Sequence, residues 1–342
     1  MEKKSYRKHF ILLLVILVIL FVLNISLGSV SIPFKDILNT LIGNAATKES
    51  WHTIVLNFRL PKAITAVLVG SGLSVAGLLM QTLFRNPLAG PFVLGISSGA
   101  SLGVALLILG SSLFGGFFFA NAISSWSLPI ASSLGAFLVL SAVIIAANRV
   151  KNTMSILIIG LMFGSLTSAI ISVLSYFSEA AQIQQFIFWS FGSLGNLSWN
   201  ELLIFIVIYS IGMLATLAII KPLNSFLLGE NYAKSLGINV KKSRNTILLI
   251  TSILTGVITA FAGPIAFIGL AVPHIARMIF VTSNHKTLIP AVVLLGAIIM
   301  LICDGIAQLP NSEFTLPINA ITSLFGAPIV IWLLIRKKKL FI

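Results

Sequence analysis

Charged residues are scarce in this sequence, and acidic residues are the scarcest of all. Only 9% of its 342 residues are charged, with 8 Asp and Glu against 22 Lys and Arg, and the mean hydropathy is +1.08. A soluble domain carries about 25% charged residues. Because so little polar surface cannot solvate a globule, the composition excludes a soluble globular protein and predicts a polytopic membrane protein.

Residues and motifs for catalysis or metal binding are also missing. The sequence has a single cysteine, Cys303, and its four histidines are scattered along the chain. One cysteine excludes an intramolecular disulfide framework. The phosphate-loop pattern G-x-x-x-x-G-K-[ST] does not occur, and neither does H-E-x-x-H. We therefore expect no catalytic residue, no metal site and no cofactor bound by this chain.

Long apolar runs, by contrast, are abundant. A membrane-spanning helix needs about 20 mostly apolar residues, and ten stretches meet this requirement. They cover approximately residues 10–28, 61–83, 91–110, 124–147, 154–176, 201–220, 245–262, 264–281, 287–305 and 317–335. A helix satisfies every backbone N–H and C=O within itself, so continuous runs favour helices over a β-barrel. The predicted fold class is all-α, with about ten transmembrane helices.

The basic residues predict the orientation of these spans. With the N-terminus in the cytoplasm, the inner segments contain eighteen Lys and Arg residues and the outer segments only four: Lys35, Lys48, Arg59 and Lys62. Cytoplasmic loops are enriched in Lys and Arg, so both termini are predicted to be cytoplasmic. The net charge of +14 is spread over many short loops, which argues against nucleic-acid binding. Ten spans also allow an inverted repeat of spans two to five and seven to ten.

Asp304, at the end of the ninth predicted span, is the clearest ionisable residue within the membrane. Such residues are candidates for function. One carboxylate alone makes no proton relay, so we favour a structural role, in which Asp304 lies at the outer interface and caps the following segment. His274 and Arg277, near the inner end of the eighth span, are interpreted as a hydrogen-bonded histidine and a basic residue at the inner surface.

The inner loop 221–244 is longer than the roughly 2–8 residues of a simple helix–helix connection. Its centre, residues 230–236, is predicted to form a short helix that Gly237 ends. Three apolar residues share one face of this helix: Leu228, Tyr232 and Leu236. A stripe of this kind on the cytoplasmic side suits the groove of a partner protein. The alternative is a surface helix that rests on its own bundle.

Arg59 and Lys62 are unusual because basic residues are disfavoured on the outer face. Exposed charges of this kind would attract the acidic surface of an incoming partner. Contact with lipid headgroups is the alternative explanation.

A series of motifs follows in order along nearly the whole chain. In the first half they are Arg59-Leu-Pro-Lys62, Gly70-Ser-Gly72, Gln81, Arg85-Asn86-Pro87-Leu-Ala89, Leu94-Gly95 and Gly99-Ala100. In the second half they are Ala233-x-x-Leu236-Gly237, Gly263-Pro-Ile-Ala-Phe-Ile-Gly-Leu270, Pro273-His274, Arg277, Pro290, Asp304, Pro310-x-x-Glu313, Pro317 and Gly326-Ala-Pro328. Together they resemble the FecCD/vitamin-B12-type permease family, the membrane subunits of type II ABC importers for iron-siderophore complexes, haem or cobalamin.

The resemblance implies a type II ABC importer permease fold in a multi-pass protein of the bacterial cytoplasmic membrane. It implies a single transmembrane permease domain over residues 1–342, with the segment 221–244 as its coupling loop. The implied partners are a second permease subunit, identical or paralogous, two ABC ATPase subunits that use Mg-ATP, and an extracytoplasmic substrate-binding protein.

The resemblance also assigns roles to residues. Docking of the binding protein falls on Arg59 and Lys62, and the cytoplasmic gate falls on Asn152 and Thr153. Coupling to the ATPase falls on Glu230, Ala233, Leu236, Gly237, Ile238 and Asn239. The family's structural motifs correspond to Gln81, Arg85, Asn86, Pro87, Pro273, His274, Arg277 and Asp304.

Two positions depart from the family pattern. Gln308 stands four residues after Asp304, where the family commonly has Arg, and Lys62 stands where Arg is usual. One docking salt bridge is therefore expected to be absent or replaced, and bidentate pairing with a carboxylate is weakened.

The resulting hypothesis is a permease subunit for an iron(III)-siderophore-type chelate, with haem or cobalamin as alternative substrates. An ion-coupled secondary transporter is less favoured, because Asp304 alone is available to carry a coupling ion. An intramembrane enzyme is disfavoured by the missing catalytic residues.

Overall fold

The computed structural model describes residues 6–44, 46–110, 126–150, 153–308 and 314–335, and every regular element in these ranges is helical. The α-helices are α1 (Arg7–Ser26), α2 (Phe34–Leu41), α3 (Glu49–Ile54), α4 (Leu60–Phe84), α5 (Ile96–Ile108), α6 (Ser127–Arg149), α7 (Thr153–Tyr176), α8 (Ala180–Ser190), α9 (Trp199–Ala218), α10 (Ile220–Phe226), α11 (Glu230–Ser235), α12 (Val240–Ala262), α13 (Ile268–Phe280), α14 (His285–Ala307) and α15 (Ile318–Ile335). A π-helical turn η1 (Val55–Arg59) joins α3 to α4, and a 3-10 turn η2 (Pro91–Leu94) precedes α5.

The all-α prediction is confirmed. Within the described residues, seven helices are long and apolar enough to cross a membrane, and three shorter apolar helices bring the set to ten. These ten match the ten predicted stretches one for one. The third and eighth are shortened at their starts: η2 and Gly95 precede α5, and a non-helical segment, residues 263–267, precedes α13.

The chain forms two compact units, each assembled from separate stretches of sequence. The first unit comprises Met1–Val75, Ser193–Ile206 and Ala266–Ile342, and the second comprises Ala76–Gly192 and Val207–Ile265. Helices α4 and α9 each contribute residues to both. The single permease domain expected over residues 1–342 stays a prediction.

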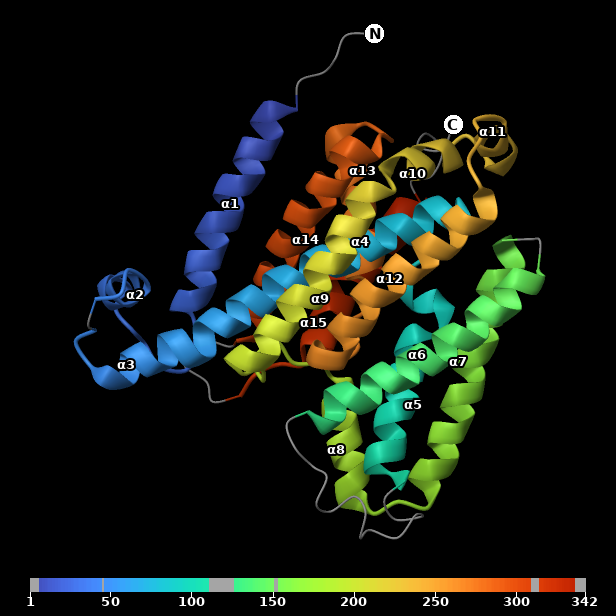
Figure 1. The fold of residues 1–342 in the computed structure, drawn as a ribbon. Coiled ribbons are helices and arrows are strands. Elements are labelled where there is room, and N and C mark those ends of the chain that lie inside the picture. The colour runs from blue at the N-terminus through green and yellow to red at the C-terminus, as the bar shows by residue number, and fades with distance from the viewer. Residues whose placement is uncertain (1–5, 45, 111–125, 151–152, 309–313, 336–342) are drawn as a thin grey trace. The chain divides into compact units, whose positions relative to one another are not determined.

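The first unit is built around α14. Helices α13, α14 and α15 pack against one another, and α1 lies along α14 (Figure 1). The first part of α4 joins them where Gly70 and Gly296 of α14 meet, so close that a Cβ added to either glycine would collide with the backbone of the other. Small residues at such crossings let helix backbones approach closely in lipid.

The second unit is built around α5. Figure 1 shows α5 flanked by α6, α7 and α8, and α12 also packs against α5 and α6. A Cβ added to Gly99 of α5 would lie 2.6 Å from the carbonyl oxygen of Gly135 of α6, so this crossing also requires glycine.

The two units are built from similar sets of helices. Each contains three consecutive apolar helices that begin with a short one, α5–α6–α7 in the second unit and α13–α14–α15 in the first. Each also takes a long helix from the other half of the chain, α12 in the second unit and part of α4 in the first. The inverted repeat itself stays a prediction.

Candidate functional site

Asp304 is the centre of a polar network at one end of the first unit. It is 2% exposed. Its Oδ1 lies 3.1 Å from Lys62 Nζ, and its Oδ2 accepts hydrogen bonds from Asn24 Nδ2 at 2.9 Å and Gln308 Nε2 at 2.6 Å. The carboxylate therefore joins α1, α4 and α14. The structural role expected for Asp304 includes a bond to Gln308 in the segment that follows, and the rest of that segment, residues 309–313, lies outside the described residues.

Arg59 belongs to the same end of this unit but is buried, with 8% of its surface exposed. Its Nη1 donates to the carbonyl oxygens of Ile25 and Ser26, each at 3.0 Å, and its Nη2 donates to the carbonyl oxygen of Val30. The last carbonyls of a helix have no partner within the helix, and a cation there is favourable. The expectation of an exposed charge at Arg59 is therefore wrong: its guanidinium holds the C-terminal end of α1.

A cavity of about 360 Å³ adjoins these basic residues. Arg59, Lys62 and Gln308 line it together with apolar residues that include Ile54 and Phe58. The Lys62 side chain is 21% exposed, so its ammonium group is within reach of a molecule in the cavity. With Arg59 and Lys62 positive and Asp304 negative, the formal charge of this cluster is +1. The cavity can thus receive an anionic group.

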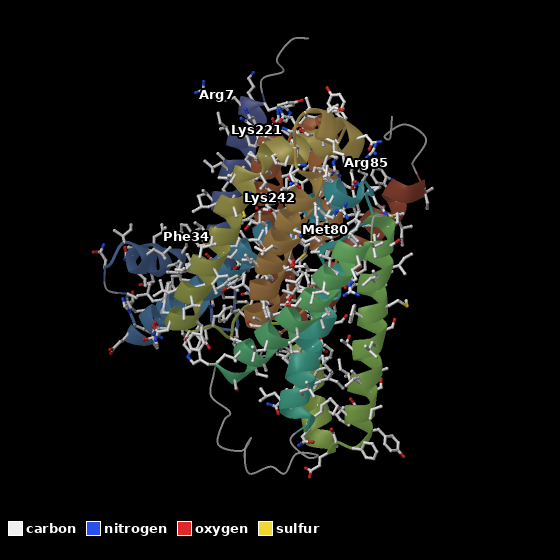
Figure 2. The ribbon with its side chains drawn as sticks, turned by 45° about the vertical axis from the view of Figure 1, so that its right-hand side comes forward. Arg7, Phe34, Met80, Arg85, Lys221 and Lys242 are labelled. Atoms are coloured by element: carbon white, nitrogen blue, oxygen red, sulfur yellow. The ribbon has the colours of Figure 1, made fainter. Side chains whose placement is uncertain are left out.

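In the second unit, the predicted motif from Gln81 to Pro87 forms a tight turn at the end of α4. Asn86 N–H donates to the carbonyl of Gln81 at 3.2 Å, and Asn86 Oδ1 accepts from the N–H of Leu88 at 2.9 Å. Arg85 adopts a positive φ of 47°, a conformation that non-glycine residues rarely adopt. The turn leaves the Arg85 side chain exposed, in the same part of the unit as Lys221 and Lys242 (Figure 2).

The predicted coupling helix is present as α11 (Glu230–Ser235), which ends at Leu236 and Gly237. Gly237 has a φ of 76°, the left-handed conformation expected after a helix. Ala233 is buried, and its carbonyl oxygen accepts from Ile238 N–H at 3.1 Å.

Asn239 connects this segment to the next transmembrane helix. Its Oδ1 accepts a hydrogen bond from Lys242 N–H at 2.9 Å, which makes Asn239 the N-terminal cap of α12.

The apolar stripe of the coupling segment faces solvent. Leu228, Tyr232 and Leu236 are 63%, 49% and 57% exposed. The helix itself contacts α10 and α12 of its own chain through its other face, where Ala233 is buried, so both readings of the segment stay open. Beside the stripe lies a second cavity of about 480 Å³, whose lining includes Arg85, Glu230 and Tyr232.

The remaining predicted residues lie elsewhere. Pro273 is buried inside α13, His274 is half-buried, and Arg277 lies in the last turn of that helix. Asn152 lies outside the described residues, and Thr153 begins α7 without a described side chain. The gate assignment stays a prediction.

Three residues of these sites were not assigned a site role from the sequence: Asn24, Gln308 and Arg244, whose Nη2 lies 3.7 Å from Glu230 Oε1 of the α11 segment. Gln308 was noted only as a departure from the family pattern. Asn24 carries a detectable signal, since a polar amide at the end of an apolar span is costly without a partner. Arg244 carries no such signal, because one more basic residue in a cytoplasmic loop is expected anyway.

The ten apolar helices and the buried polar network between them are the architecture of a membrane transport protein. The chain matches the family model of the FecCD transport family over residues 16–336, and it belongs to that family. It is a permease subunit of a type II ABC importer and a multi-pass protein of the bacterial cytoplasmic membrane.

Relatives with assigned names include two permeases for different substrates. The chain is 37% identical over 329 residues to the hemin transport system permease protein HmuU of Yersinia pestis, covering 96% of this chain and 95% of the relative. It is 34% identical over 286 residues to the vitamin B12 import system permease protein BtuC of Salmonella paratyphi A, covering 83% and 84%.

A solved structure is similar over almost the full length. It is described as an inward-facing conformation of a metal-chelate type ABC transporter. The TM-score is 0.83 at 30% sequence identity, covering 97% of this chain and 100% of that chain. The family prediction made from the sequence motifs is confirmed.

Proposed function

We propose that this chain is the permease for an iron(III)-siderophore-type chelate. The observation that carries the proposal is the full-length similarity to the metal-chelate type transporter, at a TM-score of 0.83. The second candidate is haem, favoured by the 37% identity to a hemin permease; cobalamin follows from the 34% identity to BtuC.

The proposed transporter contains permease, ATPase and binding-protein subunits. This chain pairs with a second permease, identical or paralogous, and two ABC ATPase subunits supply energy from Mg-ATP on the cytoplasmic side. An extracytoplasmic binding protein delivers the chelate. The polar network supports this passive role, since Asp304 is held by Lys62, Asn24 and Gln308 and is thus poorly suited to carry a coupling ion.

The ATPase is proposed to dock on the coupling segment. Exposed apolar side chains on a short rigid helix fit a groove in a partner protein, and Leu228, Tyr232 and Leu236 supply them. The capped junction at Asn239 then connects this docking site to α12.

The binding protein is proposed to dock at the 360 Å³ cavity. Lys62 offers a partly exposed ammonium group to an acidic side chain of the partner. Arg59 has a different role in this proposal: by holding the carbonyls of Ile25, Ser26 and Val30 it fixes the shape of the rim. Gln308 stands where the family commonly has Arg and donates a hydrogen bond to Asp304 Oδ2, so this position offers the partner no cation for a docking salt bridge.

The substrate class is tested by uptake into proteoliposomes. The permease is reconstituted with the ATPase and binding-protein subunits that copurify with it, and uptake of ferrichrome labelled with radioactive iron, haemin and cyanocobalamin is compared with and without ATP. ATP-dependent uptake of the ferric hydroxamate, with little uptake of the other two, supports the proposal. Preferential uptake of haemin or cyanocobalamin moves the assignment to that substrate. Uptake driven by an ion gradient without ATP overturns the importer mechanism.

A further inference from the structure

The coupling segment is tied to α12 by an ion pair as well as by the chain itself. Arg244 Nη2, near the start of α12, lies 3.7 Å from Glu230 Oε1 in the first turn of α11. The two side chains are 12% and 30% exposed, respectively. An ion pair this close to solvent adds little to stability. It does, however, connect the first turn of α11 directly to α12.

Helix α12 also carries a concentration of buried polar atoms without hydrogen-bond partners. Among the described residues, every buried side-chain nitrogen or oxygen that lacks a partner belongs to α12 or to α6, which packs against it. These atoms are Ser132 Oγ on α6 and Arg244 Nε, Thr251 Oγ1, Thr255 Oγ1 and Thr259 Oγ1 on α12.

The four residues on α12 form a line. Thr251, Thr255 and Thr259 recur every four residues, and Arg244 lies seven residues before the first, so all four fall on one side of the helix. From Arg244 to Thr259 the line runs about 22 Å, at about 1.5 Å per residue. That length covers most of the hydrocarbon core, which is about 30 Å thick.

Other buried hydroxyls in this unit are satisfied. Thr216 of α9 donates to the carbonyl oxygen of Gly212 at 2.9 Å, and Ser252 of α12 donates to that of Leu248 at 2.7 Å. A buried hydroxyl without a partner has lost its hydrogen bonds to water and forms none in the protein, which costs free energy. The packing of α12 seen here is therefore less favourable than one in which Thr251, Thr255 and Thr259 find partners.

We propose that α12 carries the motion of the coupling segment across the membrane. Arg244 is the positioning residue that attaches α12 to α11. The three unbonded threonine hydroxyls destabilise the present packing of α12, which lowers the free-energy cost of moving the helix. In a second state of the transport cycle, movement of α12 gives their hydroxyl groups hydrogen-bond partners. This inference rests on the proposed docking of an ATPase at α11.

The first experiment removes the hydroxyl groups while keeping the side-chain shape. The triple variant Thr251→Val, Thr255→Val, Thr259→Val is expected to raise the Tm of the detergent-purified permease. It is also expected to slow ATP-driven ferrichrome uptake by at least about fivefold, the lower end of typical coupling effects. The matched control is Thr216→Val, in which the lost hydroxyl was bonded; it should neither raise the Tm nor change uptake. A lower Tm of the triple variant, or normal uptake, would overturn the proposal.

The second experiment tests Arg244 through the number of ATP molecules hydrolysed per ferrichrome transported in the reconstituted complex. Glu230→Arg and Arg244→Glu should each raise this ratio about fivefold or more, and the double variant, which restores the pair with reversed charges, should return it toward the native value. The role of Arg244 would be overturned, with the docking proposal intact, by one combination of results. In it, Glu230→Arg and Arg244→Glu keep the native number of ATP molecules per ferrichrome, whereas Leu236→Ala raises it. A normal ratio in Leu236→Ala as well would overturn the docking proposal.

Discussion

Lys62 and Asp304 form an ion pair, with Nζ 3.1 Å from Oδ1, between helices that are separated by more than 200 residues of sequence. The carboxylate is almost fully buried, whereas the lysine side chain keeps 21% of its surface exposed. One partner is thus a fixed interior group, and the other is available to an incoming molecule.

The Lys62→Met substitution should destabilise the permease. It leaves the buried Asp304 carboxylate without its cation, which costs about 1–3 kcal/mol once the partial exposure of Lys62 is considered. The measurement is the thermal unfolding of the purified permease in detergent. Lys35→Met is the control, because Lys35 is an exposed lysine with no ion pair recorded among the described residues. Equal unfolding temperatures for the two variants would show that the pair contributes nothing to stability.

The Gly296→Ala substitution should be among the most damaging single methyl additions in the first unit. A Cβ there would collide with the backbone of Gly70 and with Ser74. Overpacking of this kind costs about 1–3 kcal/mol or more. Gly256→Ala is the matched control: nothing lies within 4 Å of its added Cβ, so alanine should stabilise the α12 helix by about 0.5–1 kcal/mol. Opposite shifts in Tm are expected, and a stabilised Gly296→Ala variant would contradict the observed helix crossing.

Substitutions at Leu236 and Gly237 should separate coupling from folding. Leu236 is 57% exposed, so Leu236→Ala should leave the Tm unchanged while lowering ATP-driven uptake. Gly237→Ala places a side chain at a φ of 76°, a strain of about 1 kcal/mol. The comparison is uptake against Tm for both variants, with the exposed Ile42→Ala as control. Normal uptake in Leu236→Ala would remove the basis for docking at this segment.

The segment between α2 and α3 should loosen in acid. The side-chain hydroxyl and the backbone N–H of Thr47 both donate to Asp36 Oδ1, at 2.7 Å and 2.8 Å, and these bonds lower the pKa of Asp36 below its ordinary 3.8. A lowered pKa means that the bonds stabilise the fold above pH 3.8 and are lost as the pH falls through the folded-state value.

Amide hydrogen exchange at Thr47 measures this effect, after correction for the intrinsic pH dependence of exchange. Protection should be constant between pH 7 and pH 5 and should decline below pH 3.8. The variant Asp36→Asn should show reduced protection at neutral pH with no further acid-dependent loss. A native protection factor that does not change down to pH 2 would contradict the role of the ionised carboxylate.

Much of the fold could be predicted because it follows from local properties of the chain. Ten apolar runs gave ten apolar helices, and Gly237 ended the coupling helix where its lack of a Cβ allows a left-handed turn. The details of the outer site could not be predicted in this way. Burial of Arg59 depends on carbonyl oxygens about 30 residues earlier, and the surroundings of Asp304 depend on Asn24. Such contacts are set by tertiary packing, which hydropathy and spacing do not encode.

The hydrogen bond between Asn24 and Asp304 joins residues 280 positions apart. At a bacterial synthesis rate of about 5–20 residues per second, Asp304 leaves the ribosome roughly 15–55 s after Asn24. During that interval the side-chain amide of Asn24 lacks the hydrogen bond that it later donates to the Asp304 carboxylate. The polar network around Asp304 therefore cannot form in the nascent chain until nearly all of the chain has been translated.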